Sequence, residues 1–161
     1  MKSKEYTKQL EEYLLEKRNA HFRLAYSYVK NDEDAWDILQ DAIVKALRAI
    51  HKHQYPEYIN SWFYRILINA CLDFLRKRKR FISIEETDLE TAIDHYQDLD
   101  LQQALDNLPT ELKTIIILRY FEDQKIGDIA KILDLNENTV KTKLYRSLKL
   151  LRMDLEETIY E

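Results

Sequence analysis

The chain contains a single glycine among 161 residues, and only two prolines. An average protein carries roughly 7% glycine and 5% proline. Sheet-rich folds turn often and need residues that accept a positive φ, which glycine does at the lowest cost. P-loops, dinucleotide fingerprints and nucleophile elbows each require more than one glycine. With 45% apolar and 34% charged residues, the sequence predicts an all-α fold with short connections.

The remaining composition narrows the class of protein. One cysteine, Cys71, excludes a disulfide framework and is typical of a reducing cytosol. The first residues are charged and polar, unlike a signal peptide. The longest apolar run, at 115–118, is far shorter than the ~20 residues of a membrane span. We therefore expect a soluble cytoplasmic protein that does not insert into a membrane.

Charge is distributed in blocks along the chain. The net charge of −4 would by itself disfavour nucleic-acid binding. However, residues 65–80 and 139–152 each carry a net +5, while residues 83–112 carry a net −9 with no lysine or arginine. Such blocks commonly mark interaction surfaces or unpacked segments, although any one of them can be a solvated face. Two basic blocks on either side of an acidic one favour binding surfaces.

The acidic stretch also separates two parts of the chain. Residues 83–99 contain few large apolar side chains, which is typical of a linker. We expect a helical domain at 1–82, an acidic, flexible linker at 83–99 and a second helical domain at 100–161.

The first domain shows the period of packed helices. Asn31 and Asp32 are preferred N-caps, and the apolar residues that follow step by three and four, which places them on one face. That face consists of Trp36, Leu39, Ile43, Leu47 and Ile50. Apolar residues at 22–29 indicate a preceding helix, and residues 59–80 indicate a third one. The pattern predicts a three-helix bundle.

The third predicted helix mixes aromatic and basic side chains and ends in a basic run at 76–80. Aromatic rings stack on exposed bases for about 1–3 kcal/mol each, and lysine and arginine neutralise phosphates. The residues concerned are Tyr58, Trp62, Phe63, Tyr64, Arg65 and Asn69. Trp62 and Phe63 could equally belong to the core, but the basic run could not. The helix therefore predicts contact with a DNA strand whose bases leave the stack.

The second domain contains a helix-turn-helix pattern. A helix is expected to start at Thr110, a short amphipathic helix occupies 126–133, and a second helix follows a tight connection at 134–136. The second helix of such a motif lies in the major groove. Arg146 can bond guanine bidentately, worth roughly 1–3 kcal/mol, and Thr142 lies one turn before it. An ordinary helical hairpin would not need this acid-free basic face.

Three motifs occur in order along nearly the whole chain. They are residues 34–41 (DAWDILQD) with Lys45-Ala46, residues 61–66 (SWFYRI) with Asn69, Asp73 and Arg76, and Leu108-Pro109 with residues 129–146. They resemble regions 2.2, 2.3 to 2.4, and 4 of the extracytoplasmic-function (group IV) sigma factors of bacterial RNA polymerase. One departure is Asp134, at a turn where the family usually has glycine. Aspartate tolerates the left-handed backbone region better than most residues do.

The resemblance implies a subunit that binds core RNA polymerase and recognises −10 and −35 promoter elements, without catalysis, cofactor or metal of its own. It implies that the β′ clamp helices of the polymerase contact Asp34, Asp37, Leu39, Gln40, Asp41 and Lys45. The −10 contacts would be Tyr58, Asn60, Ser61, Trp62, Arg65, Asn69, Arg76 and Lys77. The −35 contacts would be Thr139, Lys141, Thr142, Lys143, Tyr145, Arg146 and Lys149. Further implied partners are the polymerase β flap and an anti-sigma factor, and the acidic linker would thread toward the RNA exit channel.

Two other classes of protein remain open on the sequence. An autonomous helix-turn-helix regulator would bind duplex DNA tightly without polymerase, although it would not need the aromatic and basic third helix. An enzyme could use His51 and His53 near Glu57 as part of a metal site, but no further histidine or cysteine lies nearby, which favours solvated loop residues. Cys71 lies in an apolar context that favours a core position.

Overall fold

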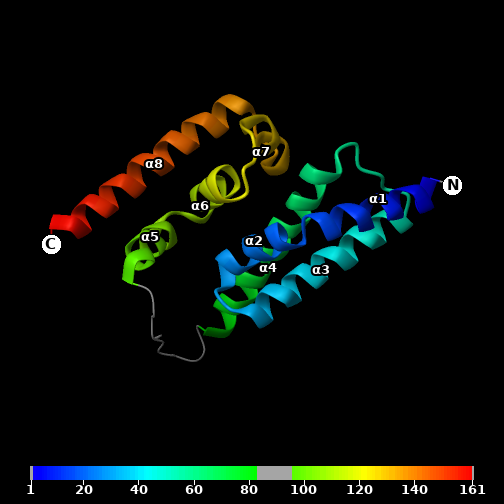
Figure 1. The fold of residues 1–161 in the computed structure, drawn as a ribbon, viewed down its shortest axis with the longest axis horizontal. Helices are drawn as coiled ribbons and strands as arrows, with labels where there is room; N and C mark the ends of the chain where they lie inside the picture. The colour runs from blue at the N-terminus through cyan, green and yellow to red at the C-terminus, as the bar shows by residue number, and fades with distance from the viewer. Residues whose placement is uncertain (1, 83–95, 161) are drawn as a thin grey trace. The chain divides into compact units, whose positions relative to one another are not determined.

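The computed structural model describes residues 2–82 and 96–160, which are helical apart from short turns, and neither range contains a strand. The chain divides into two compact units, Met1–Thr87 (unit 1) and Asp88–Glu161 (unit 2), coloured blue to green and green to red in Figure 1. The predicted all-α fold is confirmed. Within the described ranges no helix has the length and apolar character to cross a membrane. Of the expected linker, residues 83–95 lie outside the described residues, and helix α5 already begins at Tyr96.

Unit 1 contains four helices rather than the predicted three. They are α1 (Lys2–Glu16), α2 (Arg18–Val29), α3 (Asp32–His51) and α4 (Ile59–Ile82). Helices α2, α3 and α4 pack against one another, and α1 contacts all three. The additional helix is α1, in which Leu10 alone is buried. Tyr6, Leu10, Tyr13 and Leu14 follow at steps of three and four, so the sequence does contain the apolar period of this helix.

Helix α3 begins at an N-cap that the sequence predicts. The backbone N–H of Asp34 donates to Asn31 Oδ1 at 2.9 Å, and the Asn31 amide nitrogen donates to Asp34 Oδ2 at 2.9 Å. The cap satisfies a backbone donor that the first helical turn leaves without a partner. The acidic residues at 32–34 also suit the positive end of the helix dipole.

The inward face of α3 differs from the predicted one. Its buried residues are Ala35, Ile38, Leu39, Ala42, Ala46 and Ile50. Trp36 and Leu47, which were expected inside, are 37% and 38% exposed. Leu39 and Ile50 are buried as predicted, but three of the other buried positions are alanines, which a pattern based on large residues does not include.

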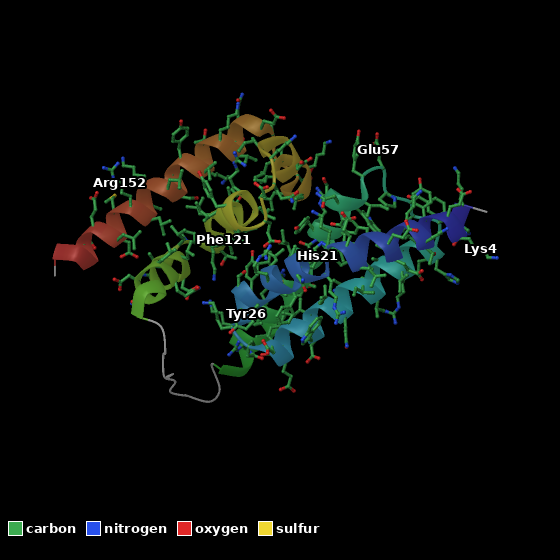
Figure 2. The ribbon with its side chains drawn as sticks, in the orientation of Figure 1. Lys4, His21, Tyr26, Glu57, Phe121 and Arg152 are labelled. Atoms are coloured by element: carbon green, nitrogen blue, oxygen red, sulfur yellow. The ribbon has the colours of Figure 1, made fainter. Side chains whose placement is uncertain are left out.

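A histidine is buried among the helices of unit 1 (Figure 2). His21 is 0% exposed, and its ring centroid lies 4.7 Å from that of Phe63 and 5.0 Å from that of Tyr64. Its Nε2 atom lies 3.0 Å from the hydroxyl oxygen of Tyr13. Burial, reinforced by the positive charge of Lys17, lowers the pKa of His21 from 6.5 to about 3. The ring is therefore neutral at physiological pH.

Unit 2 is built around one long helix. Its elements are α5 (Tyr96–Asn107), α6 (Thr110–Ile116), the π-helical turn η1 (Ile117–Phe121), α7 (Ile126–Leu133) and α8 (Glu137–Tyr160). Helices α5, α6 and α7 each pack on α8. The core consists of Leu105, Leu108, Leu112 and Ile116, with Leu144, Leu148, Leu150 and Leu151 of α8 packed against it. The predicted helix-turn-helix is confirmed as α7, a short turn and α8.

The turn between α7 and α8 is made without glycine. Asp134 adopts the left-handed conformation at φ 58° and ψ 48°, and its backbone N–H donates to the carbonyl of Ala130. The only glycine of the chain, Gly127, lies instead within α7. A Cβ atom at that position would be 3.1 Å from Glu137 Oε1 at the start of α8. Gly127 therefore leaves room for the Glu137 side chain, while aspartate makes the turn.

We expect acid to destabilise unit 1 through His21. The folded protein keeps this ring neutral down to about pH 3, whereas an unfolded histidine binds a proton below about pH 6.5. Between these values the unfolded chain binds more protons, so the free energy of unfolding falls as the pH decreases, by at most about 1.4 kcal/mol per pH unit.

Urea unfolding between about pH 7 and about pH 4 measures this fall. Tryptophan fluorescence follows unit 1 selectively, because both tryptophans, Trp36 and Trp62, belong to it. The variant His21→Gln does not titrate at this position and should show a shallower fall. The same pH dependence in both proteins would contradict the role given to His21.

Candidate nucleic-acid interface

The outer face of α3 is polar. Asp37, Gln40, Asp41 and Lys45 are exposed on it, which a docking surface requires. Lys45 Nζ lies 3.0 Å from Asp41 Oδ2 and 4.0 Å from Asp73 Oδ2 of α4. Ion pairs as exposed as these contribute about 0–1 kcal/mol each to stability. The charges can therefore exchange these partners for another protein at little cost.

Two members of the predicted docking set have other roles in the structure. Leu39 is 3% exposed, because the helix period turns it inward beside Ile38 and Ala42. Leu39 is therefore a core residue, and its burial does not support the predicted contact with the polymerase. Asp34 is half-buried, and its carboxylate accepts the hydrogen bond from Asn31 in the N-cap. Its place in the structure is at the start of α3.

An exposed apolar edge lies beside the polar face. It consists of Trp36, Val44 and Leu47, which are 37%, 43% and 38% exposed. The Phe22 ring of α2 packs on Trp36 with 4.4 Å between ring centroids, and the Arg18 guanidinium lies 5.4 Å from the Trp36 ring centre. Trp36 and Val44 are each four residues from Gln40. Trp36, Gln40 and Val44 therefore lie in one row along the helix. That spacing was available in the sequence and places the edge next to the predicted docking residues.

A row of aromatic and basic side chains lies along α4, beginning just before its first residue. Its exposed members are Tyr58, Arg65, Asn69, Arg76 and Lys77, with Trp62 half-buried. Trp62, Arg65 and Asn69 follow at steps of three and four, which places them on one face. Arg76 pairs with Asp73 at 3.0 Å, between a guanidinium nitrogen and Oδ1. Most of the predicted −10 residues are thus accessible to a DNA strand.

Other residues of the same helix face the interior. Phe63 and Tyr64 are 0% exposed and Ser61 is 8% exposed. The two aromatic residues belong to the core with His21. The burial of Ser61 does not support its predicted DNA contact, which stays a prediction. Asn60 is half-buried, and its Oδ1 accepts a hydrogen bond from the Tyr13 hydroxyl at 2.9 Å. The sequence pattern contained no sign of that contact.

The predicted −35 residues occupy the first half of α8. Lys141, Thr142, Tyr145, Arg146 and Lys149 are exposed, while Thr139 and Lys143 are half-buried. Asn136 caps the helix by accepting a hydrogen bond from the Thr139 backbone N–H at 2.8 Å. A surface hollow is lined by Asn136, Asn138, Thr139, Thr142, Lys143 and Arg146. Amide, hydroxyl and guanidinium groups of this kind can hydrogen-bond base edges.

Lys143 differs from its neighbours on α8. Its Nζ lies 3.3 Å from Glu111 Oε2 of α6, so this side chain ties the helix to the rest of unit 2. Tyr145, by contrast, is 76% exposed. We therefore expect less of the DNA contact from Lys143 than from the exposed residues around it.

The histidine pair and the cysteine do not form a reactive site. His53 Nδ1 lies 2.7 Å from the Tyr55 hydroxyl. In the part of the chain that the structure describes, no three histidine, cysteine, aspartate or glutamate side chains gather as metal ligands. Cys71 is buried, as predicted, and burial raises its pKa to about 12. Its thiol is therefore a core group with little thiolate character.

Comparison with known proteins identifies two family models in the chain. Sigma-70 region 2 matches residues 15–81, and Sigma-70, region 4 matches residues 98–151. The chain is 49% identical over 160 residues to the RNA polymerase sigma factor SigV of Bacillus subtilis, with 96% of each chain covered. It is 33% identical over 129 residues to the ECF RNA polymerase sigma factor SigM of Mycobacterium tuberculosis, with 78% of this chain and 66% of that one covered.

A solved structure is also similar. It is the sigma factor RpoE from Bartonella quintana in complex with the anti-sigma factor NepR, with a TM-score of 0.74 and 26% identity. The similarity covers 92% of this chain and 98% of that one.

The chain belongs to the sigma-70 family of RNA polymerase sigma factors, in the extracytoplasmic-function group. It is a transcription initiation factor that binds core RNA polymerase and directs it to promoters. The alternative of an autonomous helix-turn-helix regulator is therefore wrong. The aromatic and basic row on α4 was the feature of the sequence that separated these two classes.

Alanine substitutions at two adjacent residues of α3 should have different effects. Leu39→Ala leaves a cavity in the core and should lower the free energy of unfolding by about 2–5 kcal/mol. Gln40→Ala removes an exposed amide and should change it by less than about 0.5 kcal/mol. Urea unfolding followed by tryptophan fluorescence measures both values. Equal losses of stability would contradict the burial of Leu39.

Proposed function

We propose that the two units of this sigma factor divide promoter recognition between them, with unit 1 binding core polymerase and the −10 element and unit 2 binding the −35 element. The observation that carries the proposal is the exposed face of α8, where Thr142 and Arg146 line a hollow at the start of the second helix of the helix-turn-helix. No acidic residue interrupts residues 139–152. A major-groove helix reads base edges with this end.

On the −35 element, Arg146 and Thr142 are proposed to contact bases and Lys149 a phosphate. A guanidinium can donate two hydrogen bonds to guanine, and a hydroxyl can bond several bases. Lys149 lies one turn further along α8 and is exposed, which suits a contact that positions the helix without reading sequence. Lys141, Tyr145 and the half-buried Thr139 complete the proposed surface.

On the −10 element, unit 1 is proposed to hold bases that have left the stack. The exposed ring of Tyr58 and the half-buried ring of Trp62 offer stacking surfaces. Amide and guanidinium groups can hydrogen-bond an unpaired base. Arg65 and Asn69 present such groups on the same row, and the half-buried Asn60 presents one beside it at the start of α4. Arg76 and Lys77, further along α4, are placed for phosphates.

The docking site for the β′ clamp helices is proposed to be the outer face of α3. Asp37, Gln40, Asp41 and Lys45 would supply its polar part, and the apolar edge at Trp36 would pack against the partner. Aromatic residues at the centre of a polar rim are typical of protein interfaces. The β flap of the polymerase is the proposed partner of unit 2.

Regulation by an anti-sigma factor completes the proposal. It is supported by the similarity to RpoE, whose structure contains the anti-sigma factor NepR. The protein would act in the cytoplasm, where promoters and polymerase are found, and would catalyse no reaction itself. Initiation chemistry would then belong to the polymerase alone.

Run-off transcription tests the division of roles. Core RNA polymerase and the full chain are incubated with a promoter library randomised in the −35 and −10 segments, and the transcripts are sequenced. Preferred bases are expected in both segments. Transcripts without base preference in either segment would overturn the proposal.

In the same assay, Arg146→Ala should reduce base preference at one position of the −35 segment and nowhere else. Loss of one bidentate contact should reduce discrimination at one base pair by about ten- to a hundredfold, with the −10 profile and core binding unchanged. Arg152→Ala is the matched control, because its guanidinium pairs with Glu156 at 3.1 Å, outside the hollow. A changed −10 profile in Arg146→Ala would contradict the assignment of unit 2.

Charge reversal on α3 should weaken polymerase binding. Asp41→Lys should lower affinity for core polymerase by on the order of tenfold, because it places a like charge beside Lys45 in the proposed interface. Glu12→Lys, an equal change at an exposed position of α1, should leave affinity unchanged. Fluorescence anisotropy of labelled protein measures both. Equal affinities of the two variants would contradict the docking face.

A further inference from the structure

Helix α1 contacts the segment that leads into α4 at two points. The Tyr13 hydroxyl donates a hydrogen bond to Asn60 Oδ1 at 2.9 Å, across 47 residues of sequence. The rings of Tyr6 and Tyr55 are stacked, with 4.5 Å between centroids and 13° between planes. Both contacts reach the segment 55–60, which holds Tyr58 and Asn60, two of the residues proposed to bind the −10 element.

The Tyr13 hydroxyl also contacts a buried histidine. It lies 3.0 Å from Nε2 of the fully buried His21. A hydroxyl has one proton, and this one goes to Asn60, so its oxygen accepts a hydrogen bond from His21 Nε2–H. Among the described residues, the other ring nitrogen, Nδ1, has no hydrogen-bond partner, as expected if it carries no proton. The hydrogen bonds therefore run in one direction, from His21 through Tyr13 to Asn60.

Packing holds the donor in place. The His21 ring lies against the buried Phe63 and Tyr64 of α4, and the Tyr13 and Phe63 rings meet edge to face with 6.1 Å between centroids. Burial keeps His21 neutral, so one nitrogen of the ring donates and the other does not. Because packing prevents the His21 ring from rotating, its N–H fixes the orientation of the Tyr13 hydroxyl that accepts from it.

We propose that Tyr13 is a positioning residue for promoter recognition, which with His21 behind it fixes the side-chain amide of Asn60 for contact with the −10 element. The inference rests on the proposed role of Asn60. Because the Asn60 Oδ1 atom accepts from Tyr13, the amide nitrogen of Asn60 points away from Tyr13. The hydrogen bond thereby fixes the orientation of the amide. Helix α1 thereby affects which bases are preferred although it does not contact them.

A residue that only stabilises the fold would have a different effect. Loss of stability lowers transcription from all promoters together and leaves the ratio between them unchanged. Loss of a fixed amide changes the ratio between bases at the position that Asn60 contacts. The readout is therefore the base-preference profile of the −10 segment, from run-off transcription with core polymerase and the promoter library.

Three variants of the full chain are compared with the unmodified protein. Tyr13→Phe removes only the hydroxyl and should lower the preference at one −10 position by roughly two- to tenfold, with the −35 profile unchanged. Asn60→Ala should change the same position. The double variant should match Asn60→Ala alone, because Tyr13 acts through Asn60 and the two effects do not add. Tyr6→Phe is the matched control: it removes a hydroxyl from the same helix, retains the stacked ring, and should leave the profile unchanged.

The possible failures are distinct. A normal −10 profile for Tyr13→Phe, together with a changed one for Asn60→Ala, would overturn the positioning role and leave the proposed role of Asn60 intact. A normal profile for Asn60→Ala would overturn both. Additive effects in the double variant would show that Tyr13 acts independently of Asn60, and would also overturn the proposal. Circular dichroism confirms that each variant is folded.

Discussion

Close packing along the alanine row of α3 is the constraint on which the rest of unit 1 depends. Ala35, Ala42 and Ala46 are fully buried, and small side chains at a helix contact permit a short distance between helices. Leu39 lies in the same row of α3 and is buried with them. The apolar edge and the polar face on the remaining sides of α3 are proposed to bind polymerase. Packing on one side of the helix therefore decides which side chains are left for the proposed docking surface.

In unit 2 one helix forms both the core and the binding surface. Leucines of α8 at positions such as 144 and 148 pack on the core cluster, while Thr142 and Arg146 of the same helix face the hollow. The turn at Asp134 sets the start of α8 relative to α7, and Gly127 leaves room for Glu137 between them. Because Thr142 and Arg146, which are proposed to contact bases, share a helix with core residues, the leucine packing holds them in position.

The two units differ in how much of them the sequence predicts. The helix-turn-helix was predictable, since residues 126–133 have a strong helical period and Asp134 tolerates a left-handed turn. Helix α1 was not predicted, although Tyr6, Leu10, Tyr13 and Leu14 follow the helical period. On α3 the apolar pattern placed Leu39 and Ile50 inside correctly, but it was wrong for Trp36 and Leu47, which lie at the exposed edge. Side-chain size alone does not tell which part of an apolar stripe lies against the neighbouring helices.

The sequence by itself determined the all-α class through the scarcity of glycine, the division of charge into blocks, and the motifs shared with sigma factors. These are properties of local composition and spacing. Only the tertiary structure decided that Ser61 is inside while Arg65 is outside, and that His21, Tyr13 and Asn60 form one line of hydrogen bonds. Such contacts join residues as far as 47 positions apart. They depend on how helices rotate and approach one another, which no local pattern of residues specifies.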